Sequence, residues 1–396
     1  MSSDLEQRLR DAFQELPSPA REVSARARRA VLATLPPRRR GRGGWVVAVA
    51  FAVAAVVGVT AGALAATGKL HVQLGSKPAQ TAETATSRLV LPRGTHGFAV
   101  VADGRLWLAT RRGLRIEGLP VSAAELSPHA LYAVVGIGTS LVVLAPRQRH
   151  AWAHETGGRV VAAAWRPDGL QIAYVVARRG RYELRLIEGD GDHDHLVDAR
   201  VAPVKPSWRS DLLAVAYVGA GGRVIVYDLG HRSRRIVRAS TSCAGGRVLG
   251  LAFAPRDGRL AFNGSTGVGV WNPGRKHISC AGGALGLTGV AWLSEGEALV
   301  TTETPRGIGL SFLRRYQSSS SGPLRTEGEA SSDAPLVGLS APPWGWPVAV
   351  ATLPPGQGTM IVRAAPPSVD GVYRFRPGVV LLRLPKRAGR LSIIWR

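Results

Sequence analysis

The densest group of potential metal ligands in the chain is the stretch EGDGDHDHLVD, residues 188–198. Three aspartates alternate with other residues in it, namely Asp190, Asp192 and Asp194. This spacing resembles the start of a calcium-binding loop, which uses hard oxygen ligands. His195, however, stands where that loop has glycine, and Val201 stands where it has a bidentate glutamate. We therefore interpret the stretch as an Asp-Gly turn between two strands, with a divalent cation site as the alternative.

Both cysteines of the chain lie in the same pentapeptide, SCAGG, at residues 242–246 and again at residues 279–283. Such duplicated thiols could bind a metal, take part in redox chemistry or form a disulfide. Disulfides persist mainly where the surroundings are oxidising. The choice among these chemistries therefore depends on how the chain repeats and on which side of a membrane this part lies.

Signatures of the common hydrolases and nucleotide-binding enzymes do not occur in the sequence. It contains no Gly-x-Ser-x-Gly elbow, no His-Glu-x-x-His pair and no phosphate-binding glycine loop. The histidines outside residues 188–198 are dispersed along the chain. We expect a protein that is not an enzyme and that needs no cofactor beyond the cation considered above.

Short alternating apolar segments, each introduced by a large apolar residue and a polar turn, recur along most of the chain. The residues that introduce them are Phe98, Leu126, Trp165, Trp208, Phe253, Trp292 and Leu339. A period of about 40–45 residues with several strands per unit is typical of β-propeller blades. The sequence thus predicts an all-β fold, a β-propeller of seven blades, or of six if the first and last copies merge. Leu391–Trp395 or Arg88–Pro92 would complete the short first blade.

Five aromatic residues of this series are predicted to lie in the blade cores: Phe98, Trp165, Trp208, Phe253 and Trp292. A large apolar side chain at the end of a strand suits the interface between neighbouring blades. Residues 317–335, QSSSSGPLRTEGEASSDAP, interrupt the pattern and are predicted to form a polar surface loop.

One repeat resembles those of a known family. The stretch AWRPDGLQIAYVVARRGRYELRLIEGDGDHDHLV, residues 164–197, is similar to a TolB-type, WD-like propeller repeat. AFAPRDGRLAF, residues 252–262, is a second match, and AWLSEGEALV, residues 291–300, a weaker one. The repeats extend from about Phe98 to the C-terminus. The resemblance implies a bacterial envelope protein that acts as a binding platform.

Residues 43–68 carry no charge and are long enough to cross a bilayer as a helix, for which about 20 residues suffice. Arginines cluster just before this segment, so the positive-inside rule predicts a cytoplasmic N-terminus and a propeller outside the cytoplasm. We predict an uncleaved single-pass anchor, with a cleaved signal peptide as the alternative. The predicted divisions are a basic tail with two short helices (1–44), the transmembrane anchor (45–68), a linker (69–94) and the propeller (95–396).

The formal net charge of +24 indicates either attraction to anionic partners or a solvated basic surface. The basic residues are scattered through the repeats, which favours the solvated surface. Nucleic acid is not an expected partner, because the predicted topology places the propeller outside the cytoplasm.

In the repeat register, Cys243 precedes Phe253 by nearly the same interval as Cys280 precedes Trp292. We therefore predict that both cysteines occupy equivalent connections between neighbouring blades. On the outer side of the membrane a Cys243–Cys280 disulfide is expected, with two small buried thiols as the alternative.

Three functions follow from these features. The first is a membrane-anchored extracytoplasmic propeller that binds an envelope protein, a peptide or an anionic polymer without catalysis. The second is a transmembrane regulator, in which the propeller senses a signal and residues 1–44 hold a cytoplasmic protein. The third is a propeller hydrolase or lyase. The absence of catalytic signatures favours the first.

Overall fold

The computed structural model describes Leu91 and residues 94–395, with gaps at 92–93, 112–114, 146–149, 239, 283–285, 294–297, 305–309, 319–322, 342–347, 353, 355–357, 365–371, 375–379 and 385–387. The predicted tail (1–44), anchor (45–68) and nearly all of the linker (69–94) lie outside the described residues. Within the described residues, no helix has the length and apolar character needed to cross a membrane. The described residues belong to the C-terminal compact unit, Ala85–Arg396.

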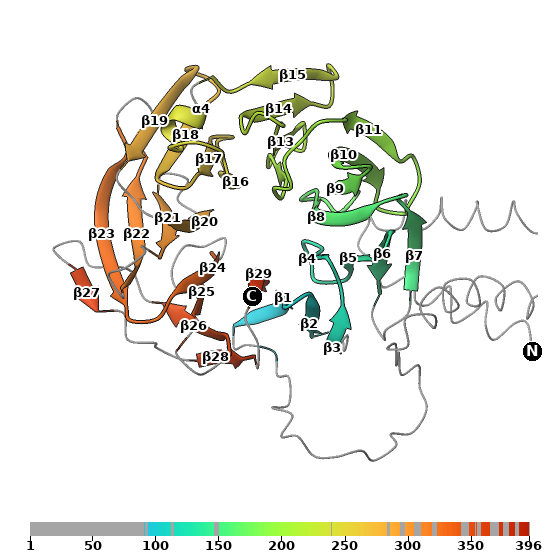
Figure 1. The fold of residues 1–396 in the computed structure, drawn as a ribbon, viewed down its shortest axis with the longest axis horizontal. Coiled ribbons are helices and arrows are strands. Elements are labelled where there is room, and N and C mark those ends of the chain that lie inside the picture. The colour runs from blue at the N-terminus through green and yellow to red at the C-terminus, as the bar shows by residue number, and fades with distance from the viewer. Residues whose placement is uncertain are drawn as a thin grey trace, which may run out of the picture. The chain divides into compact units, whose positions relative to one another are not determined.

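Seven sheets, here named blades 1 to 7, follow one another around a common centre (Figure 1). From the centre outward, blade 1 consists of β29 (Ala388–Trp395), β1 (Thr95–Ala102), β2 (Arg105–Thr110) and β3 (Arg115–Pro120). Blade 2 consists of β4 (Ala123–Leu126), β5 (Ala133–Ile137), β6 (Ser140–Leu144) and β7 (His150–Glu155), and blade 3 of β8 (Arg159–Trp165), β9 (Gln171–Arg178), β10 (Arg181–Glu188) and β11 (His195–Asp198). Blade 4 consists of β12 (Ser207–Trp208), β13 (Ala214–Val218), β14 (Val224–Asp228) and β15 (Ser233–Ile236).

The remaining three blades follow the same order. Blade 5 consists of β16 (Gly250–Phe253), β17 (Leu260–Asn263), β18 (Gly267–Asn272) and β19 (His277–Gly282). Blade 6 contains β20 (Leu287–Trp292), β21 (Ala298–Glu303), β22 (Ser311–Gln317) and β23 (Arg325–Ser332). Blade 7 consists of β24 (Leu336–Ser340), β25 (Val348–Thr352), β26 (Met360–Ala364) and β28 (Val380–Arg383). A short helix, α4 (Ser240–Cys243), lies in the connection from blade 4 to blade 5. The prediction of an all-β, seven-bladed propeller is confirmed.

The two ends of the propeller meet in blade 1. The last strand of the chain, β29, pairs antiparallel with β1, with Trp395 opposite Thr95. Its innermost position closes the ring, because an open blade edge would leave backbone groups unpaired. Two segments were predicted as candidates to complete the first blade, and Leu391–Trp395 is the one that does so. Phe98 is fully buried in a core cluster, as predicted, but it lies on the second strand of its blade and not at the end of the innermost one.

The four other predicted core aromatics share one position. Trp165, Trp208, Phe253 and Trp292 are the last residues of β8, β12, β16 and β20, and all four are buried. The indole N–H of Trp208 donates a hydrogen bond of 3.0 Å to the carbonyl of Ala164 in blade 3. Trp292 donates in the same way, at 2.7 Å, to Ala252 in blade 5. The indole of one blade thus satisfies a backbone carbonyl of the blade before it.

This arrangement yields a matched pair of substitutions. Trp208→Phe should cost about 1–2 kcal/mol of unfolding free energy beyond the loss of ring size, because it leaves the Ala164 carbonyl without its donor. Trp165→Phe should lower the unfolding free energy only by the packing lost with the larger ring. The Trp165 indole nitrogen is buried and has no hydrogen-bond partner among the described residues, so no hydrogen bond is lost. Urea unfolding of the two variants measures the difference, and equal losses would contradict the prediction.

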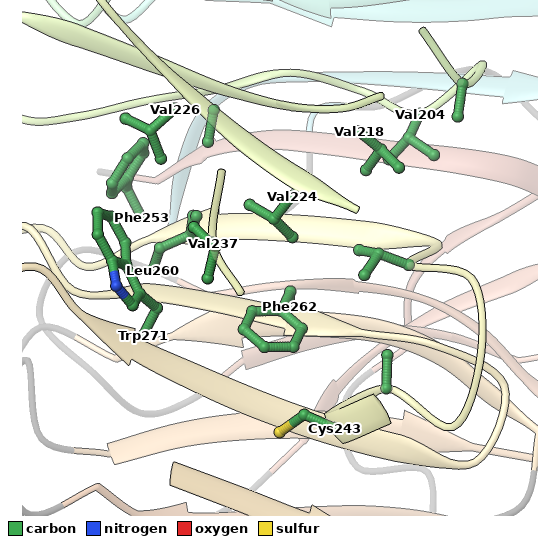
Figure 2. Close-up of a cluster of buried hydrophobic side chains, with 14 of the residues drawn as sticks. Val204, Val218, Val224, Val226, Val237, Cys243, Phe253, Leu260, Phe262 and Trp271 are labelled. Atoms are coloured by element: carbon green, nitrogen blue, oxygen red, sulfur yellow. The ribbon is translucent and has the colours of Figure 1, made fainter. Parts of the chain in front are cut away.

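Apolar side chains fill the interfaces between blades. Because each sheet is covered on both faces, a strand such as β13 is buried at every residue. Figure 2 shows the interface of blades 4 and 5, where Val224 and Val226 of blade 4 face Phe253, Phe262 and Trp271 of blade 5. Such interfaces hold the repeats together, since one four-stranded sheet cannot cover its own faces.

Blade 6 departs from the four-strand pattern. A short strand from the excursion between β26 and β28, β27 (Val372–Arg374), pairs in parallel with the outermost strand β23, with Ala330 opposite Tyr373. Blade 6 thereby gains a fifth strand at its outer edge. The prediction of a polar surface loop at 317–335 is wrong for residues 325–332, which form β23 itself. The polar residues of β23 suit an outer strand.

Candidate functional site

The acidic stretch 188–198 forms the reversal between β10 and β11, in agreement with the turn interpretation. The turn closes through hydrogen bonds from Glu188 N to Asp192 O and from Gly191 N to Glu188 O, each 2.9 Å. Gly191 has a φ of 94°, a conformation that favours glycine. Asp190 accepts a hydrogen bond from the backbone N–H of Asp192, at 3.2 Å. These contacts explain the Asp-Gly pattern by turn geometry.

Asp194 is engaged by three side chains from two blades. Its carboxylate accepts hydrogen bonds from Tyr174 Oη at 2.9 Å and from Arg185 Nη2 at 2.7 Å. His154 Nε2, on the outermost strand of blade 2, lies 3.2 Å away. Burial by itself would raise the pKa of Asp194, but the bonds from Arg185 and Tyr174 outweigh burial and hold that pKa below its usual range. The carboxylate therefore ties blade 2 to blade 3.

The three aspartates do not converge on one point. Asp194 faces Arg185, whereas Asp190 is occupied with the turn. Across the described part of the chain, no three His, Cys, Asp or Glu side chains are grouped so as to hold a metal ion. The cation alternative at Asp190, Asp192 and Asp194 thus gains no support from the geometry.

The cysteines are joined but do not occupy equivalent places. Cys243 ends helix α4, whereas Cys280 lies within β19, the outermost strand of blade 5. Their sulfurs are bonded, and their Cα atoms are 5.4 Å apart. The prediction of equivalent connections is wrong, because the second SCAGG segment is part of a strand. The disulfide instead fastens the connection from blade 4 to the outer edge of blade 5.

A pocket of about 200 Å³ opens where the innermost strands of blades 5 and 6 begin; we call it the inner pocket. Its lining comes from three blades: Val204 and Lys205 before β12, Leu249–Leu251 at β16, Asn263 at the end of β17, and Leu287–Val290 at the start of β20. Most of these side chains are apolar. Leu249 is 53% exposed, one of few large apolar side chains that the described surface leaves open.

Asn263 is one of three polar residues that line the inner pocket, with Lys205 and Thr288. Its side chain is 2% exposed, and its Oδ1 has no hydrogen-bond partner among the described residues. Gly250 stands opposite Asn263 on the neighbouring strand, and a Cβ there would lie 2.3 Å from Oδ1. Glycine therefore makes room for the amide. A buried acceptor without a donor is unfavourable unless a bound group supplies the donor.

Lys205 borders the inner pocket and already has a partner. Its Nζ lies 2.7 Å from Glu125 Oε2, on the innermost strand of blade 2. This ion pair spans two blades and leaves the pocket without a strong net charge. The inner pocket can therefore take an apolar group that carries an N–H or O–H donor for Asn263.

No sequence pattern pointed to the inner pocket. Its residues come from separate repeats, and none belongs to a motif. Gly250 and Asn263 gave no signal of their own, because blade 6 has a similar pair, Gly289 opposite Thr302, at the equivalent position.

Comparisons with known proteins support the fold and no more. No protein-family model matches the chain, and no curated protein matches it. Among solved structures, it is similar to the Cps50 (Swd1) β-propeller domain of Myceliophteria thermophila, with 12% identity, coverage of 69% of this chain and 90% of that one, and a TM-score of 0.50. A chain of the mitotic checkpoint complex aligns at 13% identity, with coverage of 82% and 92% and a TM-score of 0.54. A functionally unknown protein of Desulfotomaculum acetoxidans aligns at 9% identity, with coverage of 76% and 99% and a TM-score of 0.58. The structural neighbours thus include WD40-type propellers.

Proposed function

We propose that this protein is a membrane-anchored, non-catalytic scaffold whose propeller binds a segment of another envelope protein at the inner pocket. One observation carries the proposal: Asn263, whose buried Oδ1 has no hydrogen-bond partner among the described residues, lines an apolar pocket together with the exposed Leu249. A peptide supplies both complements, an apolar side chain for the leucines and a backbone N–H for the asparagine. WD40-like neighbours, one of them from a multiprotein complex, agree with protein binding.

The same proposal places the propeller outside the cytoplasm, with residues 45–68 as the anchor and residues 1–44 inside. The uncharged segment and the arginines before it support this orientation. The Cys243–Cys280 bond supports it as well, since disulfides persist mainly in oxidising compartments. Assignment to the TolB type remains part of the proposal and rests on the repeat at residues 164–197.

Site-specific photocrosslinking in membranes that contain the full chain tests the proposed site. A crosslinking amino acid at Leu249 should capture one defined partner protein, whose crosslinked peptide is identified by mass spectrometry. The control is Leu213, which is 54% exposed but lies in the turn between β12 and β13, at the opposite end of the innermost strands. Asn263→Leu, a near-isosteric change, should lower the yield at Leu249 by roughly tenfold because the acceptor is lost.

Two outcomes would overturn the proposed site. Equal yields from Leu249 and Leu213 would mean contact without specificity, and a yield at Leu249 that survives Asn263→Leu would remove the amide from recognition. The thermal midpoint of Asn263→Leu is measured alongside, and Asn263→Asp, which keeps an acceptor, should retain the crosslink.

A further inference from the structure

We propose that the outer edge of blade 4, strand β15, binds an extended acidic segment of another protein as an added fifth strand. This surface is distinct from the inner pocket, because β15 is the outermost strand of its blade (Figure 1). The occupant is a peptide segment in β-conformation with carboxylate side chains.

Strand β15 is unusually open. All four of its residues, Ser233–Ile236, are exposed, whereas the outermost strands β3, β11 and β19 each contain partly covered or buried residues. Ile236 is 52% exposed, although it is an isoleucine in a regular strand. An added strand would cover part of this apolar surface.

The backbone of β15 has two sets of hydrogen-bonding groups directed outward. Val237 N donates to Val224 O, at 2.9 Å, so this pair is a hydrogen-bonded pair of the antiparallel ladder. Hydrogen-bonded and non-hydrogen-bonded pairs alternate along such a ladder. Ile236, opposite Ile225, and Arg234, opposite Tyr227, are therefore non-hydrogen-bonded pairs. Their N–H and C=O groups point away from β14, where a further strand would pair with them.

Blade 6 already shows this mode of pairing. Its outermost strand β23 carries β27 as a parallel fifth strand with a register of three residue pairs. The excursion that supplies β27 comes from blade 7, so a blade edge of this propeller accepts a strand from a distant part of the chain. Addition of an external strand to an exposed edge is a common mode of peptide recognition.

The charge of β15 and its flanks selects the partner. Arg232, Arg235 and Arg238 are exposed and form no ion pair among the described residues, and Arg235 is held over the Trp271 ring at 5.0 Å. Arg234 is the exception, since it lies 3.5 Å from Asp198 of blade 3. Arginines on an edge strand prevent two copies from pairing edge to edge, because like charges would face each other. The same charges attract a strand that carries glutamate or aspartate.

Binding of short model peptides to the full chain, in nanodiscs of neutral lipid, tests this surface. The probe is a fluorescent peptide of four Glu-Val repeats, with a Lys-Val peptide of equal length as control. The Glu-Val peptide should bind at least roughly tenfold more tightly, and its affinity should fall as salt is raised from about 0.05 to about 0.3 M. Hydrogen exchange should slow at the amides of Arg234 and Ile236, while that of Arg235, inside the ladder, stays unchanged.

Three variants separate backbone pairing from charge. Ile236→Pro removes an outward N–H without touching the β14 ladder and should weaken binding roughly tenfold, whereas Ile236→Ala keeps the N–H and should weaken it less. Arg232→Gln combined with Arg238→Gln should reduce both the affinity and its salt dependence.

A probe-side control leaves the protein unchanged. N-methylation of alternate residues of the Glu-Val peptide removes its donors, and binding should be lost in one of the two possible methylation registers. Equal binding of the Glu-Val and Lys-Val peptides, or full binding of peptides methylated in either register, would overturn the proposal. Absence of Glu-Val binding at millimolar concentration would do so too.

Discussion

Removing the Cys243–Cys280 bond should lower the free energy of unfolding by about 3–4 kcal/mol. The bond closes a loop of 37 residues, and the chain-entropy estimate for a loop of that length gives this value. Cys243 is buried and Cys280 is exposed, so the suitable variant is Cys243→Ala with Cys280→Ser. Alanine avoids a buried hydroxyl, and serine suits the surface. Urea unfolding of the variant and of the oxidised wild type measures the loss.

Reduction of the wild-type protein is the matched control, because it breaks the same bond without changing any other atom. It should give a loss similar to that of the double variant. A loss below about 1 kcal/mol in both would contradict the entropic account. The loss should also be local at first: α4 is a four-residue helix whose connection is fastened to β19 by this bond. Hydrogen exchange should therefore rise in residues 240–248 at denaturant concentrations that leave blades 1 to 3 protected.

The disulfide also shows how far repeat register can be read from sequence. The aromatic residues that end β8, β12, β16 and β20 fell at the expected places, because each is followed directly by the turn to the second strand. Cys280 did not fall at its expected place between two blades, because the outer strands differ in length and the repeat is least regular there. Phe98 lies in a blade core as predicted, but on the second strand and not the first, because its blade takes its innermost strand from the C-terminus. A period counted along the chain cannot register a blade assembled from both ends.

The inner pocket and the β15 edge were beyond sequence reasoning. Gly250 lies on the first strand of blade 5 and Asn263 on the second, and only their pairing shows that a side chain at one would displace the amide of the other. The outward direction of the backbone N–H and C=O groups of Arg234 and Ile236 depends on which residue pairs of β14 and β15 are hydrogen-bonded, and the sequence does not show this. Both surfaces arise from strand pairing, whereas motif searches detect residues that are close in sequence.

Blade 6 contains the most deeply buried charged group of the described residues, and its environment depends on one arginine. The Glu303 side chain is 1% exposed and lies 2.9 Å from Arg314 Nη1. Arg314 also pairs with Glu329 on the neighbouring strand β23. Burial raises the pKa of Glu303 above its ordinary value, while the charge of Arg314 opposes that rise. Burial, and after it the charge of Glu303, raises the pKa of Tyr316 to about 12.

Arg314→Met should therefore cost about 3–5 kcal/mol at neutral pH, because it leaves the buried Glu303 carboxylate without its cation and close to that of Glu329. Arg315→Met is the control on the same strand. Arg315 pairs with Glu327 at 3.1 Å, with side chains 28% and 26% exposed, and that change should cost about 1 kcal/mol or less. Urea unfolding of the two variants at neutral pH measures both values.

The pH dependence distinguishes a lost charge partner from lost packing. A carboxyl whose pKa is higher in the folded protein than in the unfolded chain binds more protons when folded, so stability falls as pH rises through the folded pKa. Without Arg314, the folded pKa of Glu303 should rise further. The deficit of Arg314→Met should then shrink as the pH is lowered from neutral toward about 4.5, the ordinary glutamate range, where the folded protein keeps Glu303 neutral. Adding Glu303→Gln to Arg314→Met should remove that pH dependence and recover part of the stability. A deficit that is the same at both pH values would show that Arg314 acts through packing of its stem, since packing does not titrate.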